Sequence, residues 1–143
     1  MHASLKSSVG EPLRILIVDD FEPFRSTLRH FFHSFASLTV VGEAIDGKSA
    51  IEMAFDLVPQ VIIMDVKMPC LSGVEATRAI KKALPETHVI SVSLQDDTLT
   101  QDAMTAAGSS AFIMKDCAHT LPGVIARITG LPIGGDPFLE GSV

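Results

Sequence analysis

The sequence contains no tryptophan and no tyrosine, and only two of its 143 residues are cysteine. Cys70 and Cys117 form neither a CxxC pair nor a metal-binding spacing, so we expect reduced thiols rather than a disulfide or a zinc site. No apolar run approaches the roughly 18 residues that a membrane-spanning helix needs, and residues 1–11 lack the apolar stretch of a signal peptide. These absences predict a cytoplasmic protein that does not associate with a membrane.

Positive charge is also scarce. Eleven lysine and arginine residues stand against 17 aspartate and glutamate residues, for a formal net charge of −6. This balance argues against direct nucleic-acid binding by the chain, and it leaves acidic side chains that can hold a cation. A hydrophobic content of 47% with 20% charged residues is typical of one folded domain of this length.

Apolar stretches typical of buried strands alternate along the chain with amphipathic stretches of helical periodicity. We expect strands at 13–18, 38–43, 61–64, 88–93 and 110–114, and helices at 22–35, 48–57, 72–82, 96–108 and 118–129. This alternation predicts an α/β fold, the flavodoxin-like (βα)5 doubly wound parallel sheet with strand order 2-1-3-4-5. The domain is expected at 13–129, between a flexible lead at 1–12 and a flexible tail at 130–143 that holds no output domain.

The stretch from Val61 to Asp65 is the most informative in the chain. Four apolar residues predict a strand buried on both faces, and Asp65 follows them directly. A carboxylate is tolerated there only at the carboxyl edge of the sheet, where water or an ion reaches it. Met68 and Pro69 then turn the chain. Because ligands bind at this edge of open parallel sheets, Asp65 is a candidate functional residue.

Polar side chains also end the neighbouring strands. Asp19 and Asp20 follow the first strand, Ser93 ends the fourth and Lys115 follows the fifth. Paired carboxylates repel each other unless a cation lies between them, although either Asp19 or Asp20 can alternatively cap the next helix. Oxygen ligands of this kind suit Mg²⁺. A carboxylate beside Mg²⁺ and a lysine can attack a phosphoryl group and form an acyl phosphate.

The motifs and their spacing resemble the receiver domain of two-component response regulators, over roughly residues 13–129. The resemblance rests on Ile17 to Asp20, Met64 to Pro69, Ser72 to Glu75, Ser93, and Phe112 to Lys115. The Lys115-Asp116 ending is similar to that of receivers that carry a helix-turn-helix output domain of the LuxR type. Leu94 stands where the family often has alanine, and a bulkier side chain there narrows access to the site.

The resemblance implies that Asp65 is the phosphoacceptor, in a reaction that needs Mg²⁺ as cofactor. Asp19, Asp20, Asp65 and the backbone carbonyl of Lys67 would hold the metal. The phosphoryl group would come from a sensor histidine kinase or a phosphotransfer protein. The domain would be catalytic only in phosphorylating and dephosphorylating itself, not as an enzyme in the usual sense.

The resemblance also implies a switch. Ser93 and Lys115 would bind the phosphoryl group, and Phe112 is the aromatic residue that would move inward when Ser93 is engaged. The partner surface would be the fourth helix, the fifth strand and the fifth helix, with homodimerisation of the phosphorylated form as a possible outcome. Lys67 and Gln95 flank the expected path of an attacking water, so we expect both to tune dephosphorylation.

Two other functions stay open at this point. One is a receiver-like interaction module that is never phosphorylated, although such a module would be expected to lose an acidic, serine or lysine position that this chain retains. The other is an aspartyl-phosphate phosphatase similar to haloacid dehalogenases. That family has a second aspartate two positions after the nucleophile, where this chain has Lys67 after Asp65.

Overall fold

The computed structural model describes residues 10–68 and 70–133, which contain a five-stranded parallel sheet ordered β2-β1-β3-β4-β5. This confirms the predicted fold and strand order. The strands are β1 (Leu13–Val18), β2 (Leu38–Ala44), β3 (Val61–Asp65), β4 (His88–Ser93) and β5 (Ala111–Met114). Asp65 pairs with Val92, and Ser93 pairs with Met114, so the carboxyl ends of β3, β4 and β5 lie side by side.

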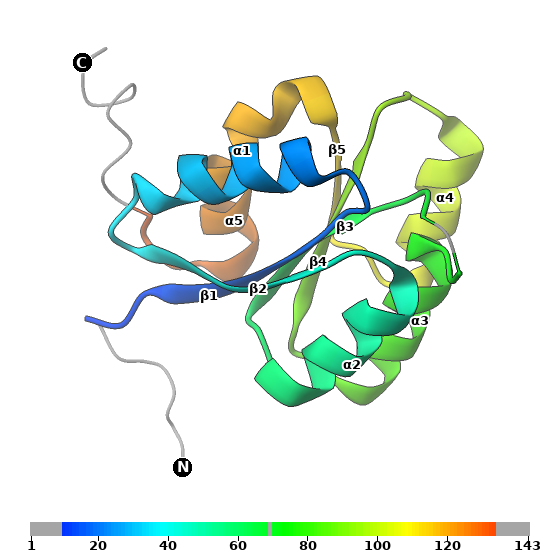
Figure 1. The fold of residues 1–143 in the computed structure, drawn as a ribbon, viewed down its shortest axis with the longest axis horizontal. Coiled ribbons are helices and arrows are strands. Elements are labelled where there is room, and N and C mark those ends of the chain that lie inside the picture. The colour runs from blue at the N-terminus through cyan, green and yellow to red at the C-terminus, as the bar shows by residue number, and fades with distance from the viewer. Residues whose placement is uncertain (1–9, 69, 134–143) are drawn as a thin grey trace.

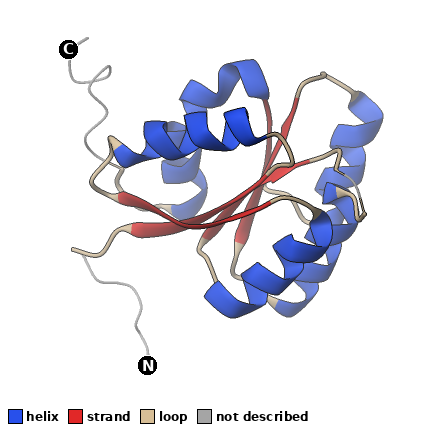
Figure 2. Cartoon of the chain, in the orientation of Figure 1, coloured by secondary structure: helices blue, strands red, loops and turns tan. Residues whose placement is uncertain are grey.

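Helices cover both faces of the sheet (Figures 1 and 2). α1 (Glu22–His33) and α5 (Leu121–Thr129) lie on one face, and α2 (Gly47–Leu57), α3 (Gly73–Ala83) and α4 (Thr98–Ala107) lie on the other. Within the described part of the chain, no helix combines the length and the apolar character needed to cross a bilayer.

The apolar runs of the strands are continuous because both faces of the sheet are buried. Ile15, Ile17 and Ile63 belong to the core under α1 and α5, whereas Ile62 and Met64 belong to the core under α2, α3 and α4. All five residues of β3 are buried, including Asp65. The central strand therefore carries a carboxylate on its last residue without a break in the packing.

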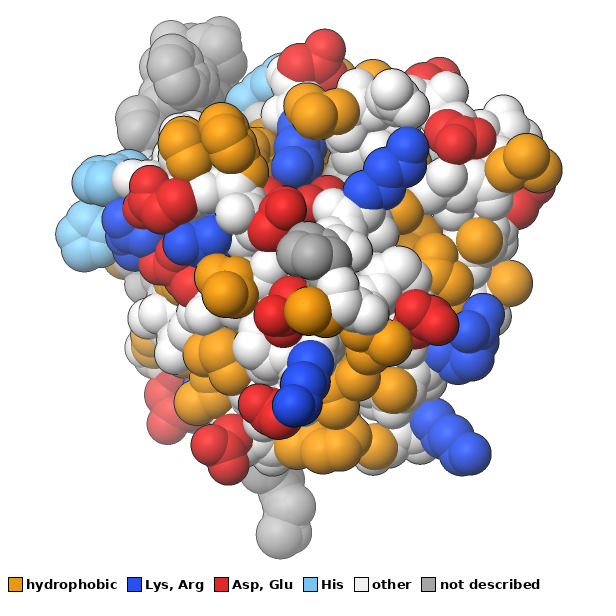
Figure 3. Space-filling view, turned by 45° about the vertical axis from the view of Figure 1, so that its right-hand side comes forward, with side chains coloured by type: hydrophobic (Ala, Val, Ile, Leu, Met, Phe, Trp, Pro, Cys, Tyr) orange, Lys and Arg blue, Asp and Glu red, His pale blue; other side chains and the backbone are white. Residues whose placement is uncertain are grey.

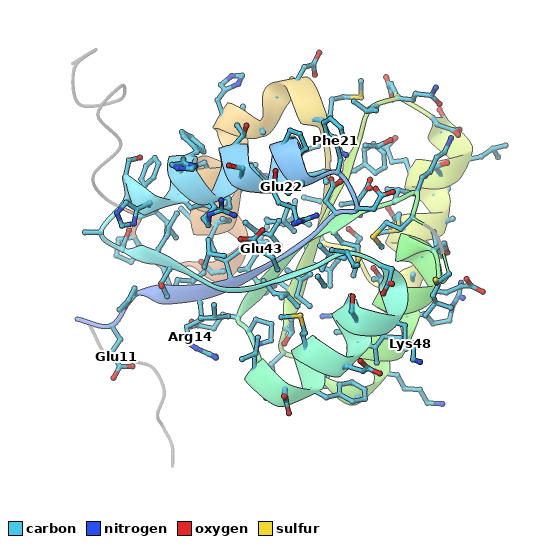
Figure 4. All side chains as sticks on the ribbon, viewed as in Figure 1. Glu11, Arg14, Phe21, Glu22, Glu43 and Lys48 are labelled. Atoms are coloured by element: carbon cyan, nitrogen blue, oxygen red, sulfur yellow. The ribbon has the colours of Figure 1, made fainter. Side chains whose placement is uncertain are left out.

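α1 is tied to the sheet by charge as well as by its apolar face. Glu43 on β2 accepts hydrogen bonds from Arg25 and Arg29, and it lies between α1 and the sheet in Figure 4. Burial alone would raise the pKa of Glu43, but the two guanidinium groups outweigh it and hold that pKa below its usual value. Arg25 also donates to the backbone carbonyl of Asp19 at 2.8 Å, which anchors the end of β1.

The loop between β3 and α3 is held against the end of β3. Ser72 accepts a hydrogen bond from the backbone N–H of Glu75, whose side chain accepts in return from the N–H of Ser72, as the sequence predicted. A Cβ at Gly73 would lie 2.2 Å from the carbonyl oxygen of Asp65. Only glycine allows α3 to begin this close to Asp65.

The chain after β5 differs from the prediction. Instead of a single helix from residue 118, a 3₁₀ helix spans Lys115–Thr120, and α5 begins at Leu121. Cys117 has non-helical angles, and Pro122 stands in the first turn of α5, where proline is favoured. The helix boundary therefore falls just before the proline rather than at Ala118.

The start of α1 excludes one of the alternatives that the sequence left open, in which Asp19 or Asp20 caps this helix. Its N-cap is Phe21, which makes no side-chain capping bond, so neither Asp19 nor Asp20 is the N-cap residue. The predictions for Pro69, for residues 1–9 and for residues 134–143 lie outside the described residues. The bounds of the domain and of its flanking segments stay predictions.

Candidate functional site

The side chains predicted from the strand ends do meet at one edge of the sheet. Asp19, Asp65 and Ser93 have exposed fractions of 0%, 5% and 6%, whereas Asp20 is exposed. The side chain of Lys115 is 10% exposed and reaches the same place from the end of β5. Two buried carboxylates, a hydroxyl and an ammonium thus share one site, bordered by an exposed third carboxylate.

The three carboxylates are close enough to ligate one cation. Asp19, Asp20 and Asp65 each offer an oxygen, and these oxygens lie within 4.8 Å of one another. Oδ1 of Asp19 accepts a hydrogen bond from the N–H of Phe21 at 2.8 Å, whereas the buried Oδ2 has no hydrogen-bond partner among the described residues. An all-oxygen donor set of this kind fits a hard cation such as Mg²⁺.

Lys115 links the carboxylates. Its Nζ lies 2.7 Å from Oδ2 of Asp19 and 3.7 Å from Oδ1 of Asp65. The short contact is an ion pair rather than a well-directed hydrogen bond, consistent with the unsatisfied Oδ2. The same ammonium lies 4.7 Å from the centre of the Phe24 ring, within cation–π range. Phe24 therefore borders the site.

The surroundings of Asp65 raise the pKa of its carboxyl group to about 7. Burial is the main cause, and the negative charges of Asp19 and Asp20 act in the same direction. The ammonium of Lys115 and a backbone hydrogen bond from Lys67 oppose the shift. A cation among these carboxylates would act in the same direction as Lys115 and favour the ionised form of Asp65. The ionised carboxylate is the form that can act as a nucleophile.

The other predicted residues lie around this centre. Ser93 Oγ accepts a hydrogen bond from the N–H of Gln95 at 3.2 Å, which leaves its O–H free to donate. Lys67 and Gln95 are exposed and line the cavity above Asp65. Phe112 is half-buried and packs against the core formed with α2, α3 and α4.

A cavity of about 580 Å³ opens over Asp65. Asp65, Ser93 and Lys115 line it together with residues from the start of α1 and from the β4–α4 loop. The space-filling view shows acidic and basic side chains adjoining one another on this part of the surface, with hydrophobic side chains beside them (Figure 3). Figure 4 shows Phe21 at the beginning of α1, next to the strand ends. The aromatic wall of the cavity was not predicted from the sequence.

Comparison with known proteins agrees with this geometry. The family described as the response regulator receiver domain matches residues 15–121. The chain belongs to this family. As a receiver it is part of two-component signalling, in which receivers in general interact with histidine kinases or phosphotransfer proteins.

Individual relatives show which proteins carry similar receivers. The chain is 40% identical over 114 residues to protein-glutamate methylesterase/protein-glutamine glutaminase 4 of Myxococcus xanthus, covering 79% of this chain and 32% of that protein. It is 37% identical over 105 residues to the response regulator protein VraR of Staphylococcus saprophyticus, covering 73% of this chain and 50% of that protein. The matches therefore span only 32% to 50% of the length of these curated relatives.

The response regulator domain of CheB from Thermotoga maritima has a similar structure, with a TM-score of 0.74 and 32% identity. The match covers 84% of this receiver and 96% of that chain. The likeness extends over nearly the whole of a solved receiver domain.

Proposed function

We propose that this receiver accepts a phosphoryl group on Asp65, in a Mg²⁺-dependent reaction, from the phosphohistidine of a sensor kinase or phosphotransfer protein. The observation that carries the proposal is the position of Asp65. Its carboxylate ends the central strand at the floor of a cavity, 3.7 Å from the ammonium of Lys115 and within reach of the Asp19 and Asp20 carboxylates.

The proposed step is a direct transfer. An oxygen of Asp65 attacks phosphorus, the bond from phosphorus to the donor nitrogen breaks, and the donor imidazole leaves with that electron pair. Lys115 then offsets the negative charge on a phosphoryl oxygen, and the Ser93 hydroxyl donates a hydrogen bond to another. The buried floor keeps most water away from the resulting acyl phosphate.

Asp19, Asp20 and Asp65 would hold Mg²⁺, with the backbone carbonyl of Lys67 as a further ligand. The bound cation would supply charge neutralisation between the carboxylates and the incoming phosphoryl oxygens. The closeness of the three carboxylates, whose oxygens lie within 4.8 Å of one another, supports this assignment. The single positive charge of Lys115 does not balance the three carboxylates of the cluster.

The signal would leave the site through Ser93 and Phe112. Movement of Ser93 toward the phosphoryl group frees space at the end of β4, and the half-buried Phe112 ring on the adjacent β5 then turns inward. This changes the surface of α4, β5 and α5, where the phosphorylated form would meet a partner or a second copy.

The experiment is intact-mass measurement after incubation with acetyl phosphate, with and without Mg²⁺, for the wild type and Asp65→Asn. The proposal predicts one phosphoryl adduct that depends on Mg²⁺ and is absent from the variant. A wild type that stays unmodified at short sampling times would instead favour a phosphorylation-independent interaction module. Steady turnover of a phosphomonoester such as p-nitrophenyl phosphate would favour a phosphatase.

A further inference from the structure

The cavity above Asp65 is larger than phosphoryl transfer requires. A phosphoryl group and the waters around a cation amount to about eight water-sized oxygens, or roughly 240 Å³ at about 30 Å³ each. The cavity measures about 580 Å³, which lies in the range of pockets that hold small organic ligands. More than half of it is therefore available to another part of a phosphodonor.

The lining is polar at the floor, whereas the outer part carries apolar side chains beside the exposed Lys67 and Gln95. Asp65 and Ser93 are buried at the floor, whereas Phe21 and Leu94 have exposed fractions of 59% and 77% at the mouth. The apolar side chains come from two separate elements, the start of α1 and the β4–α4 loop, and Phe24 and Pro23 continue the wall on the α1 side. An apolar group in the outer part of the cavity can therefore contact side chains of both elements.

The direction of transfer places the leaving group in this outer part. The attacking oxygen and the leaving oxygen lie on opposite sides of phosphorus in an in-line displacement. Because Asp65 attacks from the floor, the leaving group points toward the mouth, which Phe21 and Leu94 help to line. The residues at the mouth therefore contact the part of the donor that differs between one phosphodonor and another.

We propose that this site prefers, among small phosphodonors, acyl phosphates whose acyl group is an apolar chain of three or four carbons. This rests on the proposed phosphorylation of Asp65. The Asp65 oxygen bonds to phosphorus, the bond between phosphorus and the acyl oxygen breaks, and the carboxylate product leaves with the electron pair. Burial of each additional methylene against the apolar side chains of Phe21 and Leu94 stabilises the bound donor and the transition state alike.

The size of the effect follows from the exposure of the mouth. A fully buried methylene favours binding by about fourfold, and a partly covered one by about two- to threefold. Butyryl phosphate, with two methylenes more than acetyl phosphate, is therefore expected to react about four- to ninefold faster at donor concentrations well below saturation. Carbamoyl phosphate resembles acetyl phosphate in size but has a polar leaving group, so it is expected to gain nothing.

The experiment measures the second-order rate of Asp65 phosphorylation in Mg²⁺ for acetyl, propionyl, butyryl and carbamoyl phosphate by quenched intact mass. It then compares Phe21→Ser with Phe55→Ser, a control at a similarly exposed phenylalanine on α2, away from the cavity lining. Serine is favoured at the N-cap position that Phe21 occupies, so the variant is expected to fold.

The expected result is a rate that rises with acyl length in the wild type and in Phe55→Ser, with a ratio of butyryl to acetyl rates that falls to about half or less in Phe21→Ser. A rate that is independent of acyl length, a carbamoyl phosphate rate that matches the butyryl phosphate rate, or an equal ratio in Phe21→Ser would overturn the inference. Phosphorylation by acetyl phosphate would then still support the receiver function. Failure of all four donors would count against that function as well.

Discussion

The ammonium of Lys115 lies 2.7 Å from Oδ2 of Asp19, a full ångström nearer than it lies to Asp65. Oδ2 also belongs to the carboxylate that would take part in holding a cation. Lys115 and the cation therefore draw on the same negative charge. Their mutual repulsion is a direct, measurable consequence of this arrangement.

Replacing Lys115 with methionine is expected to tighten Mg²⁺ binding by about fivefold, because a positive charge a few ångströms from the metal is removed. The same change is expected to slow phosphorylation, because the phosphoryl oxygens lose their ammonium partner. Isothermal titration calorimetry measures the affinity, and Lys82→Met on the exposed side of α3 is the matched control. Weaker Mg²⁺ binding by Lys115→Met would show that the lysine orders the carboxylates instead of competing with the cation.

Asp65 is expected to make stability depend on pH in the presence of a chelator. Its pKa is raised to about 7, so the folded protein holds this proton more tightly than the unfolded chain does. The stabilisation from the bound proton is complete below about pH 4 and is lost as the pH rises to about 7. Asp65→Asn carries no charge at any pH and avoids this loss.

The variant should therefore exceed the wild type in free energy of unfolding at pH 8 by on the order of 2 kcal/mol, with the difference vanishing near pH 4. Urea denaturation followed by circular dichroism measures it, since the chain has no tryptophan for fluorescence. Saturating Mg²⁺ is expected to reduce the difference. If Asp65→Asn is instead less stable than the wild type at pH 8 in chelator, then burial of the Asp65 carboxylate does not cost stability as its raised pKa implies.

Ser93→Ala is expected to separate phosphorylation from the switch. The Asp65 carboxylate and Lys115 remain, so an adduct still forms, although more slowly. The hydroxyl that would follow the phosphoryl group is lost, so the Phe112 ring is expected to keep its resting environment. Aromatic ¹³C NMR of Phe112, with and without the stable phosphoryl mimic beryllofluoride, tests this; a full Phe112 shift in Ser93→Ala would remove Ser93 from the proposed path.

Lys67 and Gln95 are expected to affect the lifetime of the phosphoryl group in opposite directions. Lys67 lines the cavity with a long charged side chain, so Lys67→Ala should admit water and shorten the lifetime by about threefold or more. Gln95→Leu removes a group that can orient water and should lengthen it by a similar factor. Loss of the adduct after donor removal measures both rates, and unchanged decay in both variants would end this role.

The sequence was sufficient to predict the sheet because each strand is a short, nearly continuous apolar run. It was also sufficient to predict that Asp19, Asp65, Ser93 and Lys115 would meet, since parallel strands present their carboxyl ends at one edge. These inferences need only the strand order and the residue that follows each strand.

The wall of the site was not predictable in the same way. Phe24 has helical spacing with buried residues of α1, so its periodicity indicates core packing and gives no sign of the Lys115 ammonium 4.7 Å from its ring. That contact depends on how the first turn of α1 lies over the end of β5. The 3₁₀ turn before α5 was missed because Ala118 is a strong helix former and makes the helix seem to begin three residues before Leu121.

The measurement that tests the central claim most directly is the location of the phosphoryl group. Borohydride reduces an aspartyl phosphate to homoserine, so phosphorylation with acetyl phosphate and Mg²⁺, followed by reduction and peptide mass mapping, identifies the residue modified. We expect homoserine at position 65 and at neither 19 nor 20. Homoserine at position 19 or 20, or an unmodified residue 65 in protein that carries the phosphoryl group, would contradict it.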